Sequence, residues 1–125
     1  MSDADLTVAV DDHELAADWV EENPETRAAI REALPLAGDA TRWGDELYFR
    51  TSVDVDPESS RLEVATGALA YWAQGNALCL FWGPTPASDG DAPKAAGPVN
   101  VVARVRDVDA LDSVDGGAQV RVEET

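Results

Sequence analysis

The sequence predicts a mainly β fold, in which seven or eight short strands and one substantial helix form a small closed barrel with helical plugs. Three observations support this prediction. The stretch from Gly67 to Pro86 holds two apolar runs on either side of the pair Gly75-Asn76, a pattern typical of a β-hairpin. The other apolar segments are short, rich in β-prone residues and separated by turn signals. Clear helical periodicity follows Asn23.

The first elements are two strands and this helix. Leu6 to Val10 alternates in polarity and predicts a first strand, while Glu14 to Val20 predicts a second, although its alanines suit a helix equally well. The helix is expected over residues 24–34, because Asn23 can cap it and Pro24 fits its first position. An apolar stripe at i, i+3 and i+4 gives this helix one buried face.

After the helix, residues 35–44 are expected to form a loop that carries Trp43. Asp45 to Thr51 predicts a strand in which Tyr48 and Arg50 share one face. The remaining elements are expected as a turn over 53–60, a short strand over 62–65, hairpin strands over 69–72 and 77–82, a surface loop over 87–98, a strand over 99–105, a short helix over 108–114 and a closing strand over 118–123.

The hairpin aromatics come in adjacent pairs. Because neighbouring residues of a strand face opposite ways, Tyr71 and Trp72 cannot both enter one core, and neither can Phe81 and Trp82. One member of each pair is expected to face outward or to lie under a covering helix or loop. The pattern does not say which member that is.

The chain is strongly acidic. It has 25 acidic and 9 basic residues, a net charge of −16 and Lys94 as its single lysine. Such a surface repels itself in ordinary salt, and this repulsion is screened in concentrated salt. The composition therefore indicates a protein of a salt-accumulating, halophilic archaeon. Binding to nucleic acid is not expected, because phosphate contacts need clustered arginine and lysine.

The length of 125 residues predicts one domain over residues 1–125, with residues 1–5 disordered. No apolar run reaches the roughly 18 residues of a membrane span, so no membrane partner is expected. The amino terminus lacks the features of a secretion signal, and Cys79 is the only cysteine. A lone cysteine in an apolar strand favours a reduced compartment, and the cytoplasm is the expected location.

Three segments resemble a known family. They are residues 43–49 with the sequence WGDELYF, residues 67–86 with the sequence GALAYWAQGNALCLFWGPTP, and residues 99–102. Together they are similar to a family of small bacterial and archaeal cyclophilin-like proteins. The resemblance implies a closed, mostly antiparallel barrel of about eight strands with helices at its ends. It does not imply the cyclophilin reaction, since the function of that family is largely unestablished.

The preferred functional hypothesis is a binding module. Its aromatic side chains are expected to line a groove outside the barrel that accepts a peptide segment, such as a proline-containing one, or a small ligand. The candidate ligand-binding residues are Tyr48, Trp43, Glu46, Tyr71, Trp72, Trp82 and Thr85. For each of them, a structural role in the core or in a turn remains an alternative. The oligomeric state is left open.

The alternative hypothesis is an enzyme, a weak peptidyl-prolyl cis-trans isomerase in which Arg50 polarises the prolyl amide. Cyclophilins carry a Phe-His-Arg sequence in a strand, and Tyr48-Phe49-Arg50 resembles it without the histidine. Arg50 would otherwise be a solvent-facing arginine that pairs with an acid. A third hypothesis is a structural or assembly subunit without a small ligand.

Other chemistry has little support in the sequence. His13 is the only histidine and has no cysteine or histidine partner nearby, so a metal site is not expected. The sequence has no phosphate loop and no dinucleotide glycine pattern, and no cofactor is expected. Cys79 lies in an apolar strand with no histidine near it in sequence, which is typical of an inert core thiol.

The charge leads to a first prediction. The unfolding temperature should rise steeply between about 0.1 M and above about 1 M salt, because the Debye length falls to roughly 3 Å and repulsion among the acids is screened. Thermal unfolding followed by circular dichroism in a potassium chloride series measures this. An unfolding temperature that does not change with salt would contradict the inference of a halophilic protein.

Overall fold

The computed structural model describes residues 4–125, which form an antiparallel β structure with one α-helix and two short 3-10 helices. The elements in chain order are β1 (Leu6–Val10), β2 (His13–Trp19), α1 (Pro24–Ala33), β3 (Leu36–Asp39), β4 (Thr41–Arg42), β5 (Glu46–Arg50), β6 (Arg61–Glu63), β7 (Ala68–Trp72), η1 (Ala73–Gly75), β8 (Ala77–Phe81), β9 (Lys94–Val105), η2 (Asp109–Ser113) and β10 (Gln119–Glu124). Of the residues expected to be disordered, 1–3 lie outside the described part. Asp5, which was also expected to be disordered, is placed: its carboxylate accepts a hydrogen bond from the backbone N–H of Trp19 at 3.0 Å.

The strands form one strongly curved sheet, but this sheet is not a closed barrel. Its hydrogen-bonded order is β3-β10-β1-β2-β9-β7-β8-β5-β4, with β6 paired to β9 beside this path. The prediction of a closed barrel of about eight strands was therefore wrong in closure and in number, since the described residues form ten strands. The reason is that β3 and β4, the two ends of the order, follow each other in the chain with only Ala40 between them. They continue one another instead of pairing side by side.

Two segments that were expected to be loops contain strands. Residues 35–44 hold β3 and β4, and the expected surface loop over 87–98 ends in the first five residues of β9. Both segments are rich in glycine, alanine and proline, which locally favour turns. Their strand conformation comes from partners distant in sequence, since β3 pairs with β10 and the start of β9 pairs with β6. The hairpin of β7 and β8 was predicted correctly, as were β1, β2, β5 and β10.

The helix α1 was expected to be capped by Asn23, but Asn23 has a different role. Its φ of 54° is left-handed, and its side chain makes no cap hydrogen bond. Instead it donates to the Val101 carbonyl at 2.9 Å and accepts from the Ser59 N–H at 2.7 Å. Glu58, from the segment between β5 and β6, caps the helix by accepting the Thr26 N–H at 2.7 Å. A carboxylate there also interacts favourably with the helix dipole.

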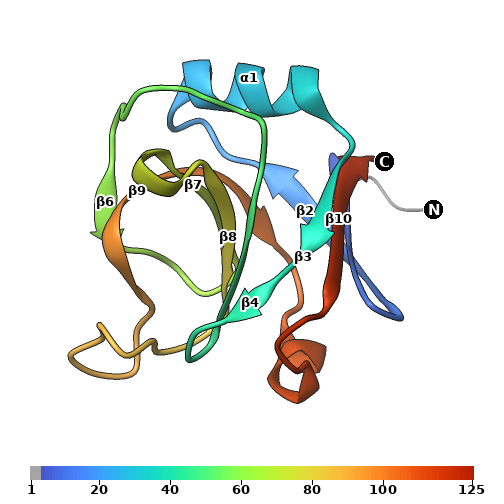
Figure 1. Cartoon of the computed structure of the whole chain (residues 1–125), viewed down its shortest axis with the longest axis vertical. Coiled ribbons are helices and arrows are strands. Elements are labelled where there is room, and N and C mark those ends of the chain that lie inside the picture. Colours follow the sequence, from blue (N-terminus) through green and yellow to red (C-terminus); the bar gives the residue numbers. More distant parts are fainter. Residues whose placement is uncertain (1–3) are drawn as a thin grey trace.

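Asn100 of β9 lies at the centre of this polar region and is almost fully buried. Its amide nitrogen donates to the Thr26 hydroxyl at 2.9 Å and to the Asp56 carbonyl at 3.2 Å. Its amide oxygen accepts from the Glu58 N–H at 3.2 Å and from the Ser60 hydroxyl at 2.5 Å. These bonds fix the long segment between β5 and β6 against α1, where it passes across the helix toward β6 (Figure 1).

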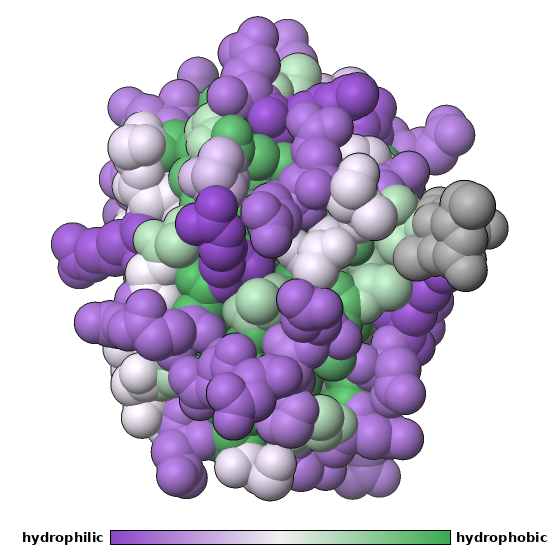
Figure 2. Space-filling view, turned by 90° about the vertical axis from the view of Figure 1, so that its right-hand side faces the viewer, coloured by the Kyte–Doolittle hydropathy of each residue, from purple (hydrophilic) through white to green (hydrophobic). Residues whose placement is uncertain are grey.

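The hydrophobic core is divided by the sheet into two clusters. The inner cluster lies under α1 and includes alternate residues of three strands, namely Leu47, Phe49, Leu69, Tyr71, Leu78 and Leu80. The outer cluster, on the opposite face of the same strands, includes Ala68, Ala70, Ala77, Cys79 and Phe81, and it is covered by β6 and the start of β9. The molecular surface is mostly hydrophilic, as one face shows (Figure 2). No helix among residues 4–125 is long and apolar enough to cross a membrane.

The Asn100 network gives a stability prediction. Asn100→Ala should lower the free energy of unfolding by about 2–4 kcal/mol, because buried partners lose their hydrogen bonds. Urea unfolding followed by fluorescence measures the change. Gln74→Ala, which truncates an exposed amide, serves as the control and should have little effect. Equal stability of the two variants would show that the network does not hold the segment in place.

Candidate functional site

The outer face of the hairpin region brings chemically useful side chains together. Along β5, Glu46 and Tyr48 point to this face, while Leu47 between them enters the inner core. Tyr48 lies directly across from Cys79 of β8, because antiparallel pairing aligns the two residues. Trp72, at the end of β7, packs against the same outer cluster. The alternation of the three strands therefore places an acid, a thiol and two aromatic rings on one face.

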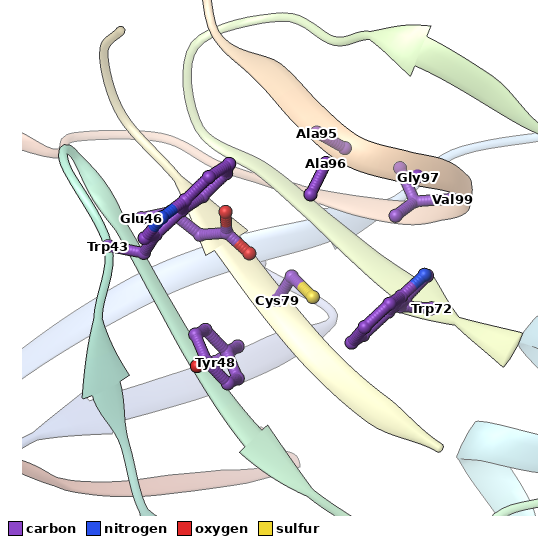
Figure 3. A pocket seen from close by; sticks show the side chains of 9 residues that line it. All are labelled: Trp43, Glu46, Tyr48, Trp72, Cys79, Ala95, Ala96, Gly97 and Val99. Atoms are coloured by element: carbon purple, nitrogen blue, oxygen red, sulfur yellow. The ribbon is translucent and has the colours of Figure 1, made fainter. Parts of the chain in front are cut away.

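A cavity of about 130 Å³ opens among these side chains. It is far larger than the roughly 10–15 Å³ that one water molecule requires. Figure 3 shows Trp43 and Tyr48 on one side, Trp72 opposite them, the Glu46 carboxylate and Cys79 between them, and the start of β9 along the remaining edge. The residues that line it are Trp43, Glu46, Tyr48, Trp72, Cys79, Ala95, Ala96, Gly97 and Val99.

Two glycines make room for the Trp72 ring. A Cβ atom at Gly75 would lie 2.4 Å from the ring, and one at Gly97 would lie 3.0 Å from the indole nitrogen. Gly75 is therefore needed for close contact, and the positive φ in this turn belongs to Asn76 alone. The Trp72 N–H is buried and has no hydrogen-bond acceptor among the described residues. An unpaired buried donor costs about 1–3 kcal/mol, so the ring is held here against an energetic penalty.

Glu46 is the buried acid of the cavity, and only 5 % of its surface is exposed. Burial disfavours the charged form and raises the pKa of Glu46 to about 7, although a hydrogen bond from the Cys79 thiol opposes this rise. Burial, together with the neighbouring Glu46, also raises the pKa of Cys79 well above its usual value. Cys79 therefore stays a neutral thiol, as expected for a core residue, and the acid is poised to gain or lose a proton near neutral pH.

Four of the candidate residues from the sequence line this cavity, namely Trp43, Glu46, Tyr48 and Trp72. Tyr71 does not, because it lies fully buried in the inner core and its hydroxyl donates to the Val53 carbonyl at 2.6 Å. In the first aromatic pair it is thus Trp72 that faces the outer side.

Trp82 and Thr85 lie outside the cavity. The Trp82 ring is buried in the inner cluster, its N–H donates to the Asp112 carboxylate of η2 at 2.8 Å, and the Arg42 guanidinium lies 5.1 Å from the ring centre. In the second aromatic pair it is thus Trp82 that enters the inner core, while Phe81 lies on the outer face and is covered there. Thr85 is also buried, and its hydroxyl donates to the Lys94 carbonyl, so it connects the turn after β8 to the start of β9.

Arg50, the candidate catalytic residue, is exposed at the end of β5. It shares a separate surface depression with Gly38, Asp39, Thr41, Tyr48 and Phe49, and it does not line the cavity that contains Glu46. Tyr48 borders both spaces. No group of three or more potential metal ligands occurs among the described residues.

The residues of β9 that line one side of the cavity were not predicted from the sequence. Ala95, Ala96 and Gly97 fall in the stretch expected to be a surface loop, because small residues beside prolines resemble a loop in isolation. The available signal was their size: a run of small side chains can approach an aromatic ring closely. The pairing with β6 that brings them there is not encoded locally.

Comparison with known proteins identifies the family. The sequence model of the Cyclophilin-like family matches residues 4–123. The chain belongs to this family. No match to a curated protein was found for this cyclophilin-like protein.

Solved structures agree with this assignment. A hypothetical protein from Archaeoglobus fulgidus, whose solution structure is known, is 39 % identical, and the alignment covers 100 % of both chains with a TM-score of 0.79. McbB, solved in complex with tryptophan, is 17 % identical with a TM-score of 0.69. That alignment covers 94 % of the present chain but 44 % of McbB, and it shows a shared fold.

The raised pKa of Glu46 predicts a pH-dependent difference in stability. The folded protein holds the Glu46 proton more tightly than the unfolded chain, so stability should fall as pH rises from about 4.5 to about 7 and stay constant above that. Glu46→Gln mimics the protonated acid and should gain up to about 3 kcal/mol relative to the wild type above pH 7.

Urea unfolding of both proteins at pH 5 and pH 8 measures this difference. Glu14→Gln removes the same charge from an exposed position on β2 and should show no such gain. If Glu46→Gln and the wild type have the same difference in free energy of unfolding at pH 5 and at pH 8, the Glu46 carboxylate is solvated in solution.

Proposed function

We propose that this protein is a binding module, whose cavity between Trp43, Tyr48 and Trp72 receives a small ligand or one side chain of a peptide segment. The observation that carries this proposal is the convergence of three aromatic rings and a buried acid on one space. Ligand sites are typically apolar, aromatic concavities with a few polar groups that fix orientation. The cavity of about 130 Å³ suits a head group or a side chain, and is too small for a large molecule.

The energetics of the lining residues support a role in binding. Glu46 is buried with the weak donor Cys79 beside it, and the Trp72 N–H is buried without an acceptor among the described residues. Both arrangements reduce stability, and each such group in a native protein calls for an explanation. A ligand that interacts with Glu46 would offset part of this loss. McbB, which shares the fold, has been solved with tryptophan, so tryptophan belongs among the compounds to test.

The isomerase hypothesis has less support from the geometry. A prolyl isomerase needs its cation beside an apolar groove that holds the proline, and Arg50 is exposed and outside the aromatic cavity. The third hypothesis, an assembly subunit without a ligand, would leave the cavity without a role.

We further propose that the protein acts in a reduced, salt-rich cytoplasm. Cys79 is buried as a free thiol, and the acids are spread over the chain without a basic cluster. A dispersed negative surface is suited to high salt, where its repulsion is screened.

Titration with proline-containing peptides and small amines, read by the protein's tryptophan fluorescence, and with tryptophan, read by calorimetry because it is itself fluorescent, should identify a ligand in molar salt. Ala96→Leu should weaken this binding at least about tenfold, because the larger side chain enters the mouth of the cavity. Ala96 is exposed on β9, so the variant should fold normally. Ala37→Leu makes the same change at an exposed site on β3 and should leave binding unchanged.

Substitution of single tryptophans identifies which of them give the fluorescence change. Trp43→Phe and Trp72→Phe should each reduce the ligand-induced change, because both tryptophans line the cavity, while Trp19→Phe, at a tryptophan outside the cavity, should retain it. Binding that is as strong in Ala96→Leu as in the wild type would place the ligand elsewhere. The absence of any binding across the panel would favour the assembly-subunit hypothesis.

A further inference from the structure

The charge distribution inside the cavity restricts the kind of ligand. Among the described residues that line it, Glu46 is the only carboxylic acid, and there is no arginine, lysine or histidine. The Glu46 carboxylate points into the space between Trp43 and Trp72 (Figure 3). Aromatic rings present a negative face, so rings and carboxylate together favour a positively charged group.

The cavity also lacks a counter-ion for Glu46. The Cys79 thiol is its hydrogen-bond donor, and a thiol is a weak one. Arg42 lies near β5, but its guanidinium pairs with Asp45 at 3.0 Å. Lys94, at the start of β9, pairs with Asp89 at 3.1 Å and is not a lining residue. A cation from outside would therefore supply what the chain does not provide.

The type of cation follows from the scarcity of acceptors. A primary ammonium carries three N–H donors, and beside apolar walls with one carboxylate some of them would remain unpaired. Calcium takes six to eight oxygen ligands and magnesium six, far more than the cavity's side chains offer. An ammonium bearing methyl groups needs few or no hydrogen bonds, and it presents apolar surface with a spread positive charge to the rings.

We propose that the cavity binds a methylated ammonium group, with Glu46 as its counter-ion and Trp43, Tyr48 and Trp72 as its aromatic walls. This inference rests on the proposed binding function and names its ligand class. The cation lies between the rings, its charge facing the carboxylate, and the remainder of the ligand extends past Ala96 at the exposed edge of β9.

The test compares choline with 3,3-dimethylbutanol, which has the same shape but carries no charge. Isothermal titration calorimetry in a fixed molar concentration of potassium chloride should show choline binding at least about tenfold more tightly. Glu46→Gln should remove this preference. Glu14→Gln, which deletes the same charge on β2, should keep it, and this control separates the cavity from the general negative charge of the surface.

Proton linkage provides a second measurement. Because the cation favours ionised Glu46, choline affinity of the wild type should increase from about pH 6 to about pH 8, and Glu46→Gln should lose this dependence. The other titratable groups that line the cavity are Cys79, which remains a thiol, and Tyr48. A pH dependence that persists in Glu46→Gln would assign the charge recognition to another group and overturn the inference.

The outcomes also separate this inference from the proposed function. Equal or tighter binding of the neutral alcohol would overturn the preference for a cation, while the cavity would still be a binding site. If choline fails to bind but another compound of the panel binds in a way that Ala96→Leu weakens, the cation inference is wrong and the binding function stands. If no compound binds, both proposals fail.

Discussion

The alternation of side chains along β5, β7 and β8 is the constraint on which both the core and the cavity depend. These strands pair so that Leu47, Leu69 and Leu80 meet on the inner face, while Tyr48 and Cys79 meet on the outer face. A shift of pairing by one residue would exchange the two faces. The leucine-rich inner face thus fixes the register, and the register fixes which polar and aromatic groups reach the cavity.

The outer face becomes a cavity because its cover is made of small residues. β9 crosses it with Ala95, Ala96 and Gly97, and this stretch is held by its pairing with β6 and by the bond from Thr85 to the Lys94 carbonyl. Protein interiors are normally packed to the density of organic crystals. Larger residues at these positions would have filled the space and buried Glu46 completely. The small cover leaves a space beside an acid whose pKa is already raised by burial.

The sequence predicted those parts that depend on local pattern. Alternation identified the hairpin and showed that Tyr71 and Trp72 face opposite ways, and the aromatic and acidic residues near Trp43 were recognised as candidates. Features that depend on distant partners were not predictable. Asn23 satisfies the local rule for a helix cap, but it is used to hold Val101 and Ser59, and Glu58 takes its place at α1. The ends of the sheet, β3 and β4, likewise depend on the β10 and β5 strands that they join.

The position of Glu46 matters most because the protein is so acidic. With a net charge of −16, the surface attracts every cation to a similar degree, and in molar salt this attraction is screened within roughly 3 Å. Surface acids therefore cannot distinguish one cation from another under such conditions. A carboxylate inside an apolar cavity interacts through a medium of lower effective dielectric constant, and salt screens such a partly buried charge much less than a surface charge, so its attraction for a fitting cation is weakened less. If the cavity binds a cation as proposed, its selectivity would come from Glu46, the acid that the fold buries beside three aromatic rings within residues 4–125.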